Sequence, residues 1–177
     1  MADEVVRVRH GRRTEDVVSL FVPPPQQAAA TARELALELA DFDGVVALPG
    51  SSRILDALSP SQWAAVTSGE RSLMIARLKA SGLPVPHVLI AAEDVSTGKP
   101  NPEGYLKAAR ALGFQPQDCL VIEDSPAGIG AGRAAGAQVL AVTTTHSRAE
   151  LVGADVVVPG LSCVSVEFTD PGVTVSI

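Results

Sequence analysis

Aromatic residues are scarce in this chain of 177 residues. They make up 3% of it, whereas hydrophobic residues as a whole make up 46%. Any core must therefore be built mainly from alanine, valine and leucine, a composition that suits helices packed on a parallel sheet better than an aromatic-rich β-sandwich. The length allows one domain of ordinary size, or a core with a small appendage.

Positive charge, cysteine and long apolar runs are also in short supply. Lys and Arg total 14 against 20 Asp and Glu, a net charge of −6, so nucleic acid and anionic membranes are poor partners. The two cysteines, Cys119 and Cys163, lie far apart, which favours two buried thiols in a reducing compartment. No stretch approaches the ~20 apolar residues of a membrane helix, and the acidic start is unlike a signal peptide. We expect a soluble cytoplasmic protein.

The chain changes character near Gly50. Before it, two stretches favour helix, residues 3–20 and 26–40, with a Pro23-Pro24-Pro25 break between them. After it, short apolar runs alternate with helical stretches, a pattern that predicts a parallel sheet with right-handed crossovers. The expected strands are 63–66, 88–91, 120–122, 139–142 and 156–158, and the expected helices are 71–80, 103–112 and 127–135.

Alternating apolar and polar residues mark the tail of the chain. They occupy 164–168 and 173–177 and flank a Thr169-Asp170-Pro171-Gly172 turn signal, which predicts a terminal β-hairpin. The prediction is therefore an α/β chain with a Rossmann-like parallel sheet and helices on both faces. Its expected parts are a helical region with a linker over 1–50, a core over 51–160 and the hairpin tail over 161–177.

Polar residues follow three of the expected strands, at the end where parallel α/β sheets bind ligands. Thr67-Ser68-Gly69 precedes a helix, an arrangement that binds anions but also serves as an ordinary helix cap. In Gly98-Lys99-Pro100-Asn101-Pro102 the prolines fix a turn and so the direction of the lysine. The adjacent carboxylates of Glu123-Asp124 repel each other unless a cation such as Mg²⁺ or a hydrogen-bond network stabilises them.

Taken in order, these patterns resemble motifs II, III and IV of the haloacid dehalogenase (HAD) superfamily. Its sugar-phosphatase branch, similar to 2-deoxyglucose-6-phosphate phosphatases and β-phosphoglucomutases, has motif sequences close to Thr67-Ser68-Gly69, Gly98–Pro102 and Glu123–Gly128. The resemblance extends from His10-Gly11-Arg12-Arg13 to Thr144-Thr145-His146. It implies a HAD-like core, a partial mobile cap within residues 1–50, and Mg²⁺-dependent hydrolysis of a small sugar or polyol phosphate.

The resemblance also assigns roles to individual residues. Thr67 and the Ser68 backbone would hold the phosphate, and Lys99 would neutralise the phosphate and the nucleophile. Asp124, with Glu123 close by, would hold Mg²⁺. Three residues could reach a sugar or phosphate oxygen from the cap, or else form a solvated helix face: His10, Arg12 and Arg13.

The nucleophile of this family is missing from its expected place. Members begin with an apolar strand ending in Asp-x-Asp-Gly-Thr, whose first Asp forms a phospho-aspartate. Here the one Asp-x-Asp-Gly, Asp41-Phe42-Asp43-Gly44, follows an expected helix and lies too close to Thr67. We interpret it as the return linker from cap to core, and a divergent nucleophile loop is the less favoured alternative. The sequence thus predicts an N-terminally truncated phosphatase, inactive or impaired alone; a non-catalytic phosphate-binding protein is the alternative.

The missing strand has a structural consequence. In the family it lies between the strands that end at Thr67 and Glu123, so its loss leaves two unpaired edges, and buried unpaired backbone groups are costly. We expect a compensation: the two halves close up, a domain-swapped or edge-paired homodimer forms, or the terminal hairpin covers an edge. The expected ligand is a small phosphorylated metabolite.

Overall fold

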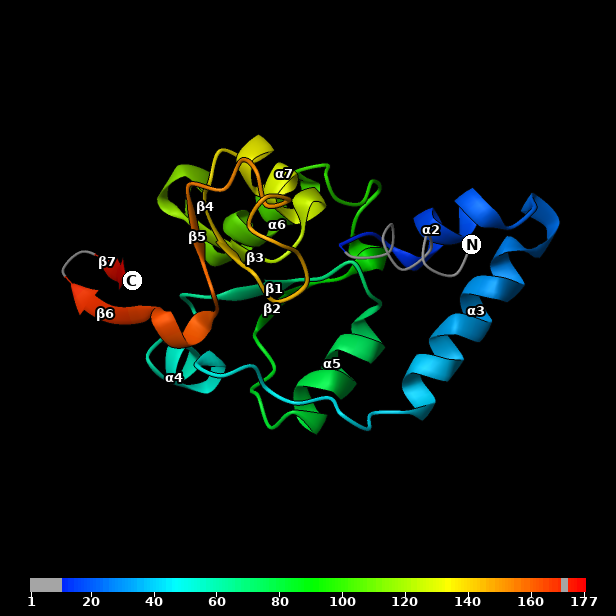
Figure 1. Cartoon of the computed structure of the whole chain (residues 1–177), viewed down its shortest axis with the longest axis horizontal. Coiled ribbons are helices and arrows are strands. Elements are labelled where there is room, and N and C mark those ends of the chain that lie inside the picture. Colours follow the sequence, from blue (N-terminus) through cyan, green and yellow to red (C-terminus); the bar gives the residue numbers. More distant parts are fainter. Residues whose placement is uncertain (1–10, 170–171) are drawn as a thin grey trace.

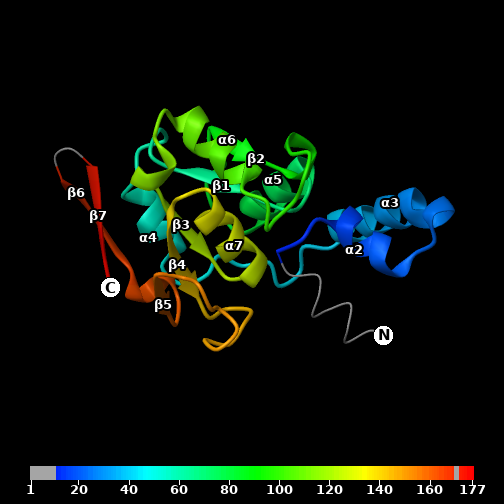
Figure 2. The ribbon, with the colours of Figure 1, turned by 90° about the horizontal axis from the view of Figure 1, so that it is seen from above.

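The computed structural model describes residues 11–169 and 172–177, and His10, one of the expected substrate contacts, lies outside them. An α/β core occupies the centre of the molecule, with two helices to one side and a β-hairpin toward the other (Figure 1). Seen from above, the two helices stand apart from the core (Figure 2).

The outlying helices are α2 (Thr14–Phe21) and α3 (Pro24–Ala40), which pack against each other. α3 starts at a proline, because proline presets the backbone angle that a first helical residue needs. None of its residues is fully buried, and its main neighbour in the core is α5 (Arg71–Ala80). α3 is therefore an attachment to the core and not part of its packed interior.

Within the described residues, five short parallel strands form two sheets. β1 (Ala64–Val66) pairs with β2 (Val88–Ile90). The second sheet has the order β3 (Leu120–Glu123), β4 (Gln138–Val142) and β5 (Val156–Val158). With α5, the helices α6 (Glu103–Leu112) and α7 (Pro126–Ala134) alternate with these strands. The bounds agree with the predictions to within one residue at each end, and the α/β class is confirmed.

Helices cover both faces of the second sheet. Along β4, Leu140 and Val142 belong to a cluster with Ile54 of α4 (Ser51–Asp56). The alternate residues of β4 belong to a second cluster with Ile129 of α7. Successive side chains of a strand point to opposite faces, so α4 and α7 lie on opposite sides. α4 was not predicted, because six residues are too few to show a helical period.

The two parallel sheets remain separate in the part of the chain that the structure describes. No ladder joins β1 to β3 there, so the two halves have not closed into one sheet. The hairpin of β6 (Ser165–Thr169) and β7 (Gly172–Ser176) pairs only with itself among the described strands. Its Val166 and Val175 pack on the face of the sheet that carries Ile54, so the hairpin adds no strand to either edge. A homodimer stays a prediction.

Cys119 and Cys163 are free thiols, but the prediction that they are buried was wrong, because Cys119 is half-buried and Cys163 is exposed. Across residues 11–169 and 172–177, no helix combines the length and the apolar character that crossing a bilayer requires. The cellular compartment stays a prediction.

Candidate active site

A cleft of about 690 Å³ lies where the carboxyl ends of β1 and β3 meet. The expected residues of all three strand-end motifs line it, namely Thr67, Ser68, Lys99, Glu123 and Asp124. Arg12, Thr14 and Glu38 also line it, and they belong to the helical attachment, the segment over residues 11–40 that carries α2 and α3. Segments far apart in the sequence thus converge at the ends of parallel strands, which is where such sheets bind ligands.

Thr67 and Ser68 follow β1 directly and differ in how their hydroxyls are used. The Thr67 Oγ1 accepts a hydrogen bond from the Gly69 N–H at 3.0 Å. Its own proton is therefore available for donation to an anion. The Ser68 hydroxyl instead donates to the Gly11 carbonyl at 2.9 Å, which ties the strand end to the start of the helical attachment. Any contribution of Ser68 to anion binding would thus come from its backbone.

Lys99 bridges the two sheets. Its Nζ donates to the Val66 carbonyl at the end of β1, at 3.2 Å, and to Oε1 of Glu123 at the end of β3. The ammonium also lies 5.2 Å from the centre of the Tyr105 ring, within the range of a cation–π interaction. Three partners on three different elements therefore hold Lys99 at the meeting point of the strand ends.

The Glu123 carboxylate accepts four hydrogen bonds. Lys99 and the Tyr105 hydroxyl both donate to Oε1. The Asp124 N–H and the Ser125 hydroxyl both donate to Oε2, each at 3.1 Å. Burial alone would raise the pKa of Glu123, but the Lys99 charge and these hydrogen bonds hold that pKa below its ordinary value. The carboxylate is ionised with its acceptor positions filled, which leaves little capacity for a metal ion.

Asp124 is held through its main chain. The Thr145 Oγ1 and the His146 Nδ1 each lie 2.9 Å from the Asp124 carbonyl oxygen. The Thr144 Oγ1 reaches the Asp124 carboxylate at 3.5 Å. That carboxylate lines the cleft, yet the described residues contain no group of three or more His, Cys, Asp or Glu side chains that could hold a metal. A Mg²⁺ ion at Asp124 would need further oxygen ligands, from the phosphate or from water.

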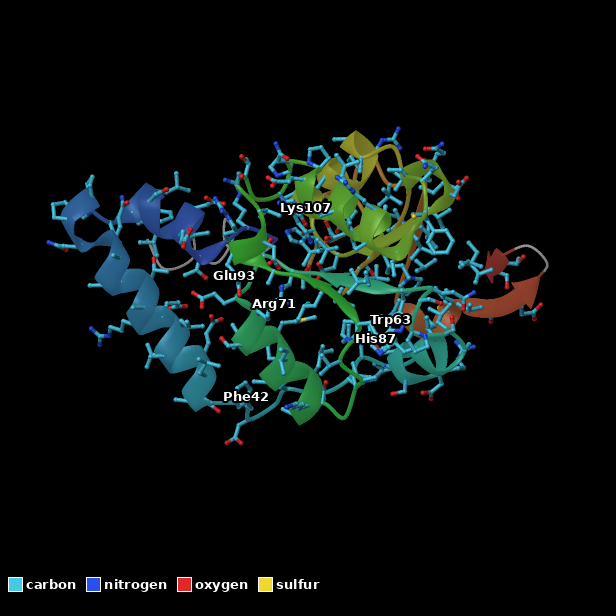
Figure 3. All side chains as sticks on the ribbon, turned by 180° about the vertical axis from the view of Figure 1, so that it is seen from behind. Phe42, Trp63, Arg71, His87, Glu93 and Lys107 are labelled. Carbon is cyan, nitrogen blue, oxygen red and sulfur yellow. The ribbon has the colours of Figure 1, made fainter. Side chains whose placement is uncertain are left out.

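The Asp-x-Asp-Gly sequence lies outside the cleft. Asp41 follows the last residue of α3, and the Asp43 N–H donates to its Oδ1 at 2.9 Å, which makes a local turn. Both aspartates are exposed, and neither is among the cleft-lining residues. In Figure 3, Phe42 lies near the end of α3, well away from Arg71, which marks the start of α5. The structure places this segment after a helix and outside the cleft, and its assignment as a linker stays a prediction.

The two described cap arginines are used differently. Arg12 lines the cleft with an exposed side chain. The Arg13 guanidinium donates to the Asp16 carboxylate at 2.9 and 3.0 Å and to the Val95 carbonyl at 3.4 Å. Hydrogen bonding to Asp16 raises the Arg13 pKa further. Arg13 therefore braces the start of the helical attachment against the core, and Arg12 is the better placed of the two to meet a ligand.

Sequence reasoning missed three residues of the site. Tyr105 is the only tyrosine in the chain and follows the Lys-Pro-x-Pro turn, but its direction could not be inferred from that position. Arg77 of α5 donates to Glu38 of α3 at 3.0 Å, and both line the cleft. They are 39 residues apart, and no pattern in the sequence marks them as partners.

Comparison with known proteins gives a consistent set of relatives. Residues 9–136 match the family model for a haloacid dehalogenase-like hydrolase. Hexitol phosphatase A of Escherichia coli (strain K12) is 37% identical over 169 residues, which cover 93% of this chain and 78% of that protein. Glycerol-1-phosphate phosphohydrolase 2 of Saccharomyces cerevisiae is 35% identical over 155 residues, 81% of this chain and 62% of the yeast enzyme. The chain thus spans about three fifths to four fifths of these relatives' lengths.

Solved structures show the same fold at lower identity. A hydrolase from Pseudomonas syringae aligns with a TM-score of 0.78 at 24% identity, over 92% of this chain and 80% of that chain. β-Phosphoglucomutase from Clostridium difficile aligns with a TM-score of 0.78 at 20% identity, over 90% and 76%. At these identities the likeness concerns the fold, which agrees with the parallel strands and covering helices described above.

Proposed function

This chain belongs to the haloacid dehalogenase-like hydrolase family, and we propose that its cleft binds the phosphate group of a small sugar or polyol phosphate. The observation that carries the proposal is the placement of Lys99, which is fixed between the ends of β1 and β3 and lines the same cleft as Thr67. The relatives are named hexitol phosphatase, glycerol-1-phosphate phosphohydrolase and 2-deoxyglucose-6-phosphate phosphatase, and each name contains a small sugar or polyol.

In this proposal the roles follow from charge and hydrogen-bonding capacity. Phosphoryl transfer depends mainly on positioning and on neutralising charge that spreads over the phosphate oxygens. Thr67 donates its hydroxyl proton to one oxygen, and the Lys99 ammonium offsets the negative charge. Arg12, at the edge of the cleft, is available to oxygens of the substrate. Glu123 does not touch the phosphate in this scheme but anchors Lys99.

We assign Asp124 as the protein ligand for Mg²⁺. This ion prefers oxygen ligands and is commonly bound by one or two carboxylates together with substrate phosphates. When bound, it would supply positive charge to the phosphate oxygens. The cleft fits Mg²⁺ only in part. The Asp124 carboxylate receives just a long hydrogen bond from Thr144 and can bind a metal, whereas the acceptor positions of Glu123 are already filled by hydrogen bonds.

We further propose that the chain of 177 residues binds its ligand without efficient turnover. Among the described cleft residues, Asp124 is the sole aspartate, and the Asp41–Gly44 turn lies elsewhere. The nucleophile would then come from a segment that pairs with the facing edges of β1 and β3. The second candidate, a non-catalytic phosphate-binding protein, is favoured by the same lack of a second aspartate in the cleft.

Hydrolysis of p-nitrophenyl phosphate with Mg²⁺ separates these functions. The 177-residue chain is expected to show no turnover. An N-terminal extension carrying an apolar strand that ends in Asp-x-Asp-Gly-Thr is expected to restore turnover. An extended chain that folds, binds phosphate and stays inactive would favour the non-catalytic protein. If the 177-residue chain shows turnover and Asp41→Asn abolishes it, the interpretation of Asp41–Gly44 as a linker is wrong.

Binding of inorganic phosphate, measured by calorimetry, tests the site without requiring turnover. Lys99→Ala should weaken it roughly 10-fold or more, because a charge-assisted contact is lost. Lys79→Ala is the matched control, since Lys79 is exposed on α5 and does not line the cleft. Equal phosphate affinity in Lys99→Ala and the unmodified chain would refute the site assignment.

A further inference from the structure

We propose that Tyr105 is a positioning residue for Lys99: its ring supports the ammonium, and its hydroxyl shares the Glu123 oxygen that Lys99 binds. The inference rests on the proposed phosphate site, because it concerns how the cation of that site is held. Tyr105 itself does not line the 690 Å³ cleft, so it acts through Lys99 and not on a ligand.

The three side chains form a closed set of contacts. The Tyr105 hydroxyl and the Lys99 ammonium both donate to Oε1 of Glu123. The same ammonium lies 5.2 Å from the centre of the Tyr105 ring. One oxygen therefore receives two donors, while the aromatic face gives the lysine a second attractive surface. A phenylalanine would provide the ring alone.

Tyr105 is itself fixed by the core, so it can serve as a platform. Its ring packs against the apolar cluster that contains Val121 and Ile129. The backbone next to it is also close to β1, because a Cβ added at Gly104 would lie 2.9 Å from Cγ1 of Val66. The helix α6 thus approaches the strand end at short range, and the ring cannot follow the lysine if the lysine moves away.

Lysine needs such support because of its flexible stem. Ordering a lysine side chain costs conformational entropy. An anion site whose cation is already ordered does not incur that cost when the anion binds. Contacts with the Val66 carbonyl, the Glu123 carboxylate and the Tyr105 ring approach the ammonium from three elements, and together they restrict its position.

The test uses the small number of lysines. The sequence has three, Lys79, Lys99 and Lys107, so ¹⁵N labelling of lysine gives three ammonium signals, and Lys99→Arg assigns one of them. Tyr105→Phe keeps the ring but removes the hydroxyl, and Tyr105→Leu removes both. Leu106→Ala is the matched control, because Leu106 lies on the same helix and is 41% exposed.

Each variant has a distinct expected result. In Tyr105→Phe, the Lys99 ammonium protons exchange faster with water, the ring-current shift of Lys99 is retained, and phosphate affinity falls roughly 5-fold. In Tyr105→Leu the ring-current shift is also lost, and affinity falls roughly 10-fold or more. The Lys79 signal stays unchanged in both variants, and Leu106→Ala leaves Lys99 unchanged.

The outcomes distinguish this inference from the proposed function. Lys99 signals that stay at their original positions and exchange rates in Tyr105→Phe overturn the positioning role; this variant carries the test if Tyr105→Leu does not fold. If the unmodified chain binds no phosphate, yet its Lys99 signal responds to both Tyr105 variants, the positioning role stands and the phosphate-binding function fails.

Discussion

Lys99 and Glu123 form an ion pair that connects the turn after β2 to the end of β3. Their side chains are only 12% and 7% exposed, and the Lys99 ammonium also donates to Val66 at the end of β1. Within the described residues no strand ladder joins the two sheets, so this pair provides a polar connection between them. Because both charges are largely buried, removing one would leave the other without its counter-charge.

The stability of the fold should depend on pH through Glu123. The pKa of Glu123 lies below its ordinary value in the folded chain, so its ionised form stabilises the fold above about pH 4.5. That contribution is lost as the pH falls through the folded pKa. Glu123→Gln should be less stable at pH 7 by about 3 kcal/mol and should lose less stability on acidification. Urea unfolding at neutral and acidic pH measures both.

The exposed hairpin residue Glu167 provides the control for this comparison. Glu167→Gln is expected to follow the pH dependence of the unmodified chain. A Glu123→Gln variant whose acid profile runs parallel to that of the unmodified chain would contradict the assignment of a depressed pKa to Glu123.

Tyr105 should ionise at unusually high pH. Burial raises its pKa well above the ordinary value, and the Glu123 charge raises it further. Because the folded state then holds a proton that the unfolded state has lost, stability should fall as the pH rises beyond about 10. The chain has one tyrosine, so ultraviolet absorbance of tyrosinate reports it directly. Glu123→Gln should lower this pKa but leave it above the ordinary value; ionisation of Tyr105 at the ordinary value would contradict the prediction.

Gly128 should tolerate no side chain. A Cβ added there would lie 1.9 Å from Cδ of Glu123, so Gly128→Ala must displace the carboxylate that anchors Lys99. We expect a loss of about 3 kcal/mol in the free energy of unfolding and weaker phosphate binding. Gly130→Ala on the same helix is the control, because a Cβ added at Gly130 would lie 3.2 Å from its nearest neighbour, Cβ of Pro100. Unchanged stability in Gly128→Ala would show that Glu123 is less tightly enclosed.

The loop after β4 should control Mg²⁺ binding through Asp124. Thr145 lies within hydrogen-bond distance of the Asp124 carbonyl, so Thr145→Val should let this main chain shift and lower Mg²⁺ affinity roughly 10-fold. Thr143→Val is the control, since the Thr143 hydroxyl donates to Pro159. Calorimetric titration with Mg²⁺ in the presence of phosphate measures the effect. Retained affinity in Thr145→Val, with loss in Asp124→Asn, would argue against a role for Thr145.

The Arg77–Glu38 pair should hold the outlying helix α3 to α5. A double-mutant cycle is expected to give a coupling of about 0.5 kcal/mol, because the Arg77 side chain is 45% exposed. High salt should reduce this coupling. Hydrogen exchange in α3 should accelerate in Arg77→Ala while exchange in α7 stays constant. Equal exchange of α3 in both proteins would mean that other contacts hold the helix.

Local pattern was sufficient to locate most of the elements. The strands and the helices α5, α6 and α7 lie within one residue of their predicted bounds, because apolar runs, helical period and proline positions act over a few neighbouring residues. The same signals placed Thr67 and Asp124 directly after strands and Lys99 in the turn beyond β2, and parallel topology brings these segments to one edge. The helix α4 escaped prediction, since its six residues are held by packing of Ile54 on the sheet.

The motif pattern in the sequence also determined that a lysine and two carboxylates would meet in one cleft, but it did not determine their partners. Glu123 and Asp124 were expected to share a metal, whereas the fold turns Glu123 toward Lys99, Tyr105 and Ser125 and leaves Asp124 at the cleft. The side chains of adjacent residues at a strand end point to opposite sides. The packing of α6 decides which of the two carboxylates faces Tyr105, and here it is Glu123. Only the tertiary structure decides that, because hydrogen-bond partners are set by distances between elements and not by spacing along the chain.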